Sequence, residues 1–160
     1  MRMPTLAKLG GLVASAALLA AAAQPVALAQ TAGPGIRAAA AADGPAYFEA
    51  TDVTHARFIL KIDDPAEIEH ARELVSGETT DRPHFLGRIG KAPAAYNPRW
   101  SFHVKSYSVH FFDQAIEVCD ATTPYVEEHL DEAGGAFLPG LVWCPWSSRL
   151  IREVPDPNRG

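Results

Sequence analysis

The chain has few of the residues and motifs that mark common binding and catalytic chemistries. Its 160 residues include only two cysteines, and its 14 Lys and Arg are outnumbered by 19 Asp and Glu. A deficit of basic residues argues against a nucleic-acid-binding protein, which needs a cationic face. No Gly-rich phosphate motif, Gly-x-Ser-x-Gly elbow, His-Glu-x-x-His or Cys-x-x-Cys pair occurs. The sequence therefore assigns no catalytic residue, no metal ligand and no cofactor, and an enzyme is the less favoured class.

Only one long apolar run occurs, at residues 9–23. Arg2 and Lys8 precede it, and Ala27 and Ala29 offer a cleavage site, which is the pattern of a secretory signal peptide. The run is shorter than the ~20 residues that a membrane-spanning helix needs. We therefore expect residues 1–29 to be a cleaved signal, the protein to be secreted, and no stable membrane insertion after cleavage. The alternative is an uncleaved anchor.

Composition divides the rest of the chain into three parts. Residues 30–45 are rich in Ala, Gly and Pro and predict a flexible linker. Residues 46–155 form a single domain, and residues 156–160 are a tail. Without the signal, the chain has 12 Lys and Arg and 19 Asp and Glu, so its net charge is near −7. Such a surface repels nucleic acid and anionic lipid.

Hydrophobic periodicity within the domain predicts an α+β fold: an antiparallel sheet of five or six strands with two helices and one disulfide. The first helix is expected to begin at Asp64 and Pro65 and to end at Gly77. The second is expected to begin at Thr123, as its N-cap, and Pro124, and to be stopped by Gly134 and Gly135. The strand candidates are a hairpin over 47–62 and the segments 85–89, 100–105, 116–119, 141–144 and 149–154. Residues 109–112 are apolar at consecutive positions, which leaves strand and helix open.

Cys119 and Cys144 form an even pair in an exported protein, which favours a disulfide between them. The alternative is a reactive thiol activated by a histidine.

Two Trp-containing stretches are the most distinctive part of the sequence. Trp beside Arg and small hydroxyl residues could line a groove for a peptide or a sugar. The alternative is that Trp100 and Trp143 fill a small core, which leaves Trp146 as the exposed one. The expected binding residues are Arg99, Trp100, His103, Trp146 and Arg149.

Histidines and carboxylates offer a second hypothesis. His84 and His103 lie in or beside expected strands, as does His110, and Glu117 and Asp120 follow closely. Such a cluster could bind a metal or act in general acid–base catalysis. This interpretation requires His103 and Glu117, with His84 or Asp120, to converge in one cleft.

Several motifs together resemble a family of small secreted bacterial proteins labelled calmodulin-binding-protein-like. The resemblance covers nearly all of residues 46–154 and implies the fold and a secreted location, but no catalytic residues. Neither expected helix has the basic cluster of a calmodulin target, so the label implies no calmodulin binding. The motifs are Phe48-x-x-Thr51-Asp52-x-Thr54, Asp64-Pro65, Asn97-Pro98-x-Trp100-Ser101-Phe102-His103, Ile116-Glu117-Val118-Cys119-Asp120, Tyr125-Val126-Glu127 and Cys144-Pro145-Trp146-Ser147-Ser148-Arg149.

We therefore expect a secreted, disulfide-stabilised binding module for an extracellular protein or peptide. A protease inhibitor is one concrete form, because the proline-flanked segments 91–98 and 138–147 could be rigid recognition loops. The alternative is an extracellular hydrolase with a His/carboxylate site, which could depend on a metal.

Overall fold

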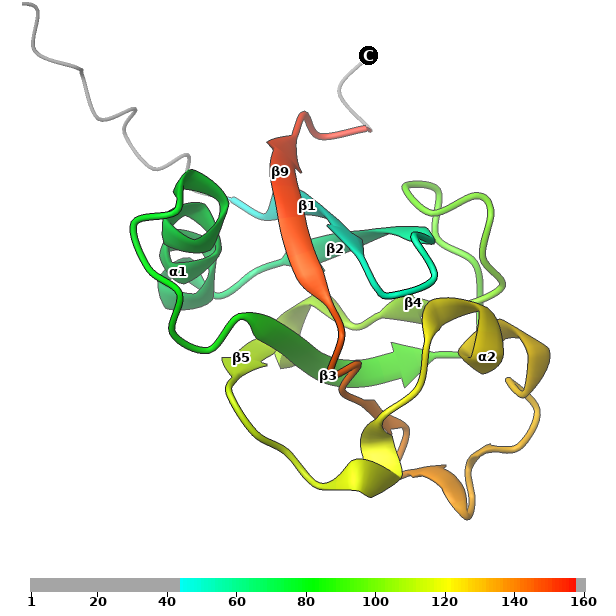
Figure 1. Ribbon diagram of the computed structural model, residues 1–160. Coiled ribbons are helices and arrows are strands. Elements are labelled where there is room, and N and C mark those ends of the chain that lie inside the picture. Colours follow the sequence, from blue (N-terminus) through cyan, green and yellow to red (C-terminus); the bar gives the residue numbers. More distant parts are fainter. Residues whose placement is uncertain (1–43, 158–160) are drawn as a thin grey trace, which may run out of the picture. The chain divides into compact units, whose positions relative to one another are not determined.

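The computed structural model describes residues 44–157, which fold into an α+β unit (Figure 1). The expected signal peptide, most of the linker and the end of the tail lie outside the described residues. The helices are α1 (Pro65–Ser76), α2 (Thr123–Glu128) and two 3-10 turns, η1 (Ser106–Ser108) and η2 (Glu117–Cys119). The strands are β1 (Ala46–Thr51), β2 (Arg57–Ile62), β3 (His84–Gly90), β4 (His103–Val104), β5 (His110–Phe112), β6 (Ala133–Gly134), β7 (Phe137–Pro139), β8 (Val142–Trp143) and β9 (Arg149–Val154).

The strands form three small sheets instead of the single sheet of five or six strands that was expected. β1 lies between β2 and β9 and is antiparallel to both. β3 pairs with β4, β5 and β8, while β6 and β7 form a short parallel pair. The α+β class, the two helices and the disulfide are confirmed. The sheets are small because β4, β6 and β8 have only two residues each, so turns and loops make up much of the chain between β3 and β9.

Helix α1 follows the expected capping residues. The Asp64 side chain accepts hydrogen bonds from the backbone N–H groups of Ala66 and Glu67, at 2.8 and 3.2 Å. Gly77 ends the helix with φ of 79°, a left-handed conformation that glycine adopts without strain. Ile68 and Ala71 are buried, so α1 contributes to the core and packs against β9 (Figure 1).

Two expectations near α2 are wrong. The helix spans Thr123–Glu128, with Thr122 instead of Thr123 as its N-cap, and it stops well short of Gly134. A longer helix would place Glu127 beside Asp131 and Glu128 beside Glu132. Like charges four residues apart repel each other, which disfavours a longer helix. The strand expected at 116–119 is instead the turn η2, because only Cys119 of this apolar run is buried.

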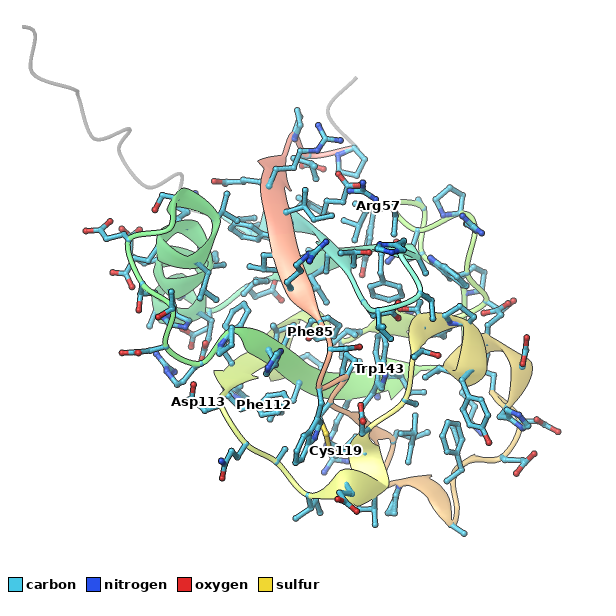
Figure 2. The ribbon with its side chains drawn as sticks, in the orientation of Figure 1. Arg57, Phe85, Phe112, Asp113, Cys119 and Trp143 are labelled. Atoms are coloured by element: carbon cyan, nitrogen blue, oxygen red, sulfur yellow. A yellow bond between two sulfur atoms is a disulfide. The ribbon has the colours of Figure 1, made fainter. Side chains whose placement is uncertain are left out.

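Trp143 is the centre of the core. It is completely buried, and its ring meets the rings of Phe58, Phe85 and Phe102 with centroids 5.1–5.4 Å apart (Figure 2). Its indole N–H donates to the Ala121 carbonyl at 2.8 Å, so the polar atom of this side chain is satisfied inside the core. The hypothesis that Trp143 fills the core is therefore confirmed.

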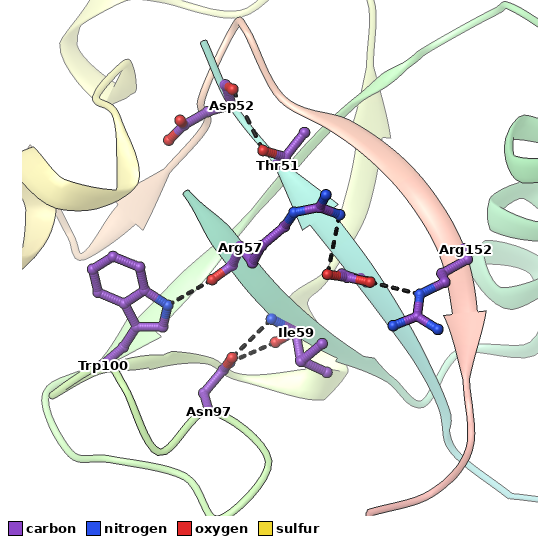
Figure 3. A network of polar contacts seen from close by, with 8 residues as sticks. Thr51, Asp52, Arg57, Ile59, Asn97, Trp100 and Arg152 are labelled. Atoms are coloured by element: carbon purple, nitrogen blue, oxygen red, sulfur yellow. Dashed lines mark hydrogen bonds and ion pairs between the residues drawn. The ribbon is translucent and has the colours of Figure 1, made fainter. Parts of the chain in front are cut away.

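The outer edge of β2 is closed by side chains of the loop that follows β3 (Figure 3). The Asn97 amide donates to the Ile59 carbonyl at 2.6 Å and accepts from the Ile59 N–H at 2.8 Å, as a neighbouring strand would. The Trp100 indole N–H donates to the Arg57 carbonyl at 2.8 Å. The run expected as a strand at 100–105 pairs only at 103–104 because its first part serves as this edge cover.

Candidate functional site

A disulfide joins the segment after β5 to the segment before β9. Cys119 and Cys144 are bonded, with their Cα atoms 5.1 Å apart, and both are buried. The Cys144 N–H also donates to the Cys119 carbonyl at 2.8 Å. The expected pairing is confirmed, and the reactive-thiol alternative is wrong because neither cysteine is free.

Asp52 fastens the turn between β1 and β2 to the same region. Its carboxylate is buried and accepts from the Thr123 N–H at 2.6 Å and from the Thr123 hydroxyl at 2.7 Å. It also accepts from the N–H and the hydroxyl of Thr54. Burial alone would raise the pKa of Asp52, but these hydrogen bonds outweigh it and hold the pKa below its usual value. The carboxylate is therefore ionised at neutral pH and links the turn to the start of α2.

Further hydrogen bonds bring three loops together beside the disulfide. The Val53 N–H in the β1–β2 turn donates to the Ser147 hydroxyl at 3.3 Å. The Trp146 N–H donates to the Asp120 carboxylate at 2.9 Å. The β1–β2 turn, the η2 segment and the segment after Cys144 are thus tied to one another by covalent and polar contacts.

These loops expose large apolar side chains. Six such side chains are strongly exposed among the described residues, and four of them belong to the three loops. Exposed apolar clusters on soluble domains commonly mark binding surfaces. Together with Arg149, which follows the third loop, we call them the Trp146 surface: Val53 (66% exposed), Ile116 (71%), Val118 (55%), Trp146 (36%) and Arg149.

Cationic side chains extend from this surface over the outer face of the first sheet. Arg57 and Arg149 are both paired with Thr51, so they flank it on the same face about 10 Å apart. Glu49 is the acidic residue of this face and binds Arg57 at 3.1 Å and Arg152 at 2.6 Å (Figure 3). No ion-pair partner of Arg149 occurs within residues 44–157.

The structure divides the five expected binding residues among three places. Trp146 and Arg149 belong to the Trp146 surface. Trp100 is only 6% exposed and anchors its loop to β2, while the Arg99 guanidinium lies 5.2 Å from the centre of the Trp100 ring. His103 lines a separate hollow with Lys61 and Lys105. The expectation that Trp100 belongs to an exposed groove is wrong because its ring closes the edge of the core.

The two segments expected as rigid recognition loops are each anchored at a few buried residues and exposed elsewhere. Asn97 is buried against β2 in the first, and Trp143, Cys144 and Pro145 are buried in the second. At the end of the second segment only Trp146 and its neighbour Ser147 reach the surface.

Two histidines of the second hypothesis, His84 and His103, lie far apart. His84 begins β3, whereas His103 pairs with Gly90 at the other end of that strand, roughly 20 Å away. Their Nδ1 atoms contact the carbonyls of Ser148 and Ala92, each at 2.8 Å. Over residues 44–157 no group of three His, Cys, Asp or Glu side chains is placed to hold a metal ion.

Sequence reasoning missed several residues that organise the site. Asp52 and Thr54 form a local Asp-x-Thr turn that could have been recognised. The hydrogen bond from the Thr123 hydroxyl to Asp52, 71 positions away, has no local signal. His110 pairs with Glu67 at 2.9 Å across 43 positions, so the carboxylate beside this histidine is neither Glu117 nor Asp120.

The fold and site define a small disulfide-clamped α+β domain with exposed apolar side chains on three linked loops. The chain belongs to the family of the BP-74 N-terminal domain, whose family model matches residues 44–157. The expected calmodulin-binding-protein-like label corresponds to this family description only loosely. No curated protein and no solved structure matches the chain significantly. Among the helices that the structure describes, none is long and apolar enough to cross a membrane.

Proposed function

We propose that the protein is a secreted binding module that recognises an extracellular protein or peptide through the Trp146 surface. The observation that carries this proposal is the exposure of Val53, Ile116, Val118 and Trp146 on loops that a disulfide and buried hydrogen bonds hold in place. Loops held in one conformation lose little entropy on binding, which favours affinity.

The disulfide and the amino-terminal pattern support a secreted location. Disulfides persist in oxidising compartments, and the segment 1–29 has the charge and apolar pattern of a signal peptide. A secreted protein can act by binding a partner outside the cell, and such binding needs no catalytic group.

The chemistry of the surface indicates the partner's chemistry. Trp146 and its apolar neighbours favour apolar side chains, and Arg149, which has no ion-pair partner within residues 44–157, favours a carboxylate. We therefore expect the partner segment to combine apolar and acidic residues. Protease inhibition is one form of such binding. In that case the exposed residues Trp146 and Ser147 would contact the protease.

Selection from a random peptide library on the purified full chain tests this proposal. Enriched peptides should contain apolar and acidic residues, and Trp146→Ala should weaken their binding at least tenfold, because a buried aromatic anchor dominates such interfaces. Tyr125→Ala is the matched control, since Tyr125 is 48% exposed on α2 and outside the Trp146 surface. Circular dichroism checks that both variants fold. Peptides that bind Trp146→Ala as well as the unaltered chain, or no enrichment at all, would contradict the proposal.

A further inference from the structure

A hollow of about 270 Å³ lies between the end of β2 and η1, apart from the Trp146 surface. We call it the Lys105 hollow. The residues that line it are Lys61, Ala94, Tyr96, His103, Lys105, Ser106 and Tyr107.

Almost every side chain of the Lys105 hollow can donate a hydrogen bond. Two are ammonium groups, one is an imidazole and three are hydroxyl groups, and no carboxylate lines the hollow. This composition stands out because residues 44–157 contain ten Lys and Arg against eighteen Asp and Glu, a net charge of −8.

The walls of the hollow are held in place by hydrogen bonds between β2 and η1. The Asp63 N–H donates to the Ser106 carbonyl at 3.3 Å, and the Ser106 hydroxyl donates to the Asp63 carboxylate at 2.5 Å. Lys61 and Lys105, which neighbour these residues in sequence, therefore line one hollow from two different segments. Such a pair of like charges is stabilised when an anion lies between them.

The protein itself neutralises only part of this charge. The Lys61 ammonium lies 3.9 Å from an Asp63 oxygen, at the limit of an ion pair. No ion-pair partner of Lys105 occurs in the part of the chain that the structure describes. The hollow therefore keeps a positive charge that a ligand can use.

Tyr96 and His103 complete the site. Burial raises the pKa of Tyr96 to about 12, with a contribution from Tyr47 and Asp63. Its hydroxyl, like that of any tyrosine, is protonated at neutral pH and can donate. His103 contacts the Ala92 carbonyl at 2.8 Å, and its ring lies over Gly90, where a Cβ atom would come within 2.6 Å of the ring. Glycine at position 90 thus permits the ring to lie against β3.

We propose that the Lys105 hollow binds a phosphate or sulfate monoester of a sugar, with Lys61 and Lys105 holding the oxyanion. A tetrahedral oxyanion accepts hydrogen bonds from several donors at once, which matches two ammonium groups beside the hydroxyl groups of Tyr96 and Tyr107. Tyr107 is 68% exposed at the rim and offers an aromatic face to the attached sugar ring. This inference concerns a site separate from the Trp146 surface and does not depend on the proposed function.

Calorimetric titration of the full chain with glucose 6-phosphate, glucose 6-sulfate and glucose tests the inference. We expect saturable binding of at least one ester and none of glucose, and the tighter ester identifies the anion. Lys105→Gln should weaken binding by about tenfold, the effect of losing one charged hydrogen bond. Raising the salt concentration from about 0.1 M to about 1 M should weaken binding further, because salt screens exposed charges.

Lys91→Gln is the matched control, because Lys91 is exposed and contacts the Asp131 carbonyl outside the hollow. Lys105→Arg keeps the charge and should retain most of the affinity, which separates charge loss from misfolding. Glucose that binds as tightly as the esters, equal weakening by Lys105→Gln and Lys91→Gln, or no detectable binding of either ester would overturn the inference.

Discussion

The carboxylate of Asp52 and the first helical residue of α2, Thr123, are joined by two hydrogen bonds, at 2.6 Å to the N–H and 2.7 Å to the hydroxyl. Asp52 follows β1 directly, and Thr123 lies four residues after Cys119. This contact therefore connects the β1–β2 turn to the disulfide region. It holds Val53 in the turn that contributes to the Trp146 surface.

Asp52→Asn should lower the free energy of unfolding by about 1.5–3 kcal/mol, because hydrogen bonds to a charged acceptor are lost within a buried site. Chemical denaturation measures this difference. Asp131→Asn is the control: Asp131 is exposed, and its substitution should change stability by less than about 0.5 kcal/mol. Equal stability of the two variants would show that the Asp52 contacts contribute little.

The stabilisation by Asp52 should depend on pH. The pKa of Asp52 is lower in the folded chain than the ~3.9 of an unfolded one, so its contribution is complete above that value. It is lost as the pH falls through the folded pKa. The difference in melting temperature between the unaltered chain and Asp52→Asn should therefore shrink as the pH is lowered from about 5 to about 2. A difference that stays constant over this range would be inconsistent with the lowered pKa.

Loss of the disulfide should destabilise the domain. The two cysteines are 25 positions apart, and the chain-entropy relation gives about 3.5 kcal/mol for a loop of this size. Chemical denaturation of the double variant Cys119→Ala/Cys144→Ala and of the disulfide-bonded chain measures the difference in their free energies of unfolding. The double variant avoids a free thiol, and a change below about 1 kcal/mol would mean that the bond constrains the unfolded chain little.

Gly87→Ala should destabilise the second sheet. A Cβ atom at position 87 would lie 2.4 Å from the Val104 side chain and 3.3 Å from the Ser108 carbonyl. Overpacking of this kind typically costs about 1–3 kcal/mol. Gly44→Ala is the matched control, because a Cβ atom there meets nothing within 4 Å. Thermal unfolding should show a lower melting temperature for Gly87→Ala alone, and equal melting temperatures of the two variants would contradict the close approach at position 87.

Local signals in the sequence predicted the elements that depend on local chemistry. Asp64, Pro65 and Gly77 mark α1 because capping is a property of neighbouring residues. The hairpin of β1 and β2 follows from alternating apolar side chains, and the Cys119–Cys144 pair from the cysteine count and the expected compartment.

The errors arose where distant contacts decide the structure. Ile116 and Val118 have the pattern of a strand, but the disulfide at Cys119 places this run in a turn with both side chains exposed. Trp100 lies beside Arg99 as in a binding groove, yet its indole N–H bonds the Arg57 carbonyl, 43 positions away. His103 and Lys105 meet Lys61 only because η1 packs at the end of β2.

The most direct test of a binding role for the Trp146 surface is photocrosslinking from position 146 in the full chain. A photoreactive aromatic amino acid replaces Trp146 in one protein and Tyr125 in another, and each is irradiated with the culture medium and surface of the producing cells. The account predicts a saturable crosslink to a defined partner from position 146 alone, competed by the unaltered chain but not by Trp146→Ala. No crosslink from position 146, or the same products from both positions, would contradict a binding role for the Trp146 surface.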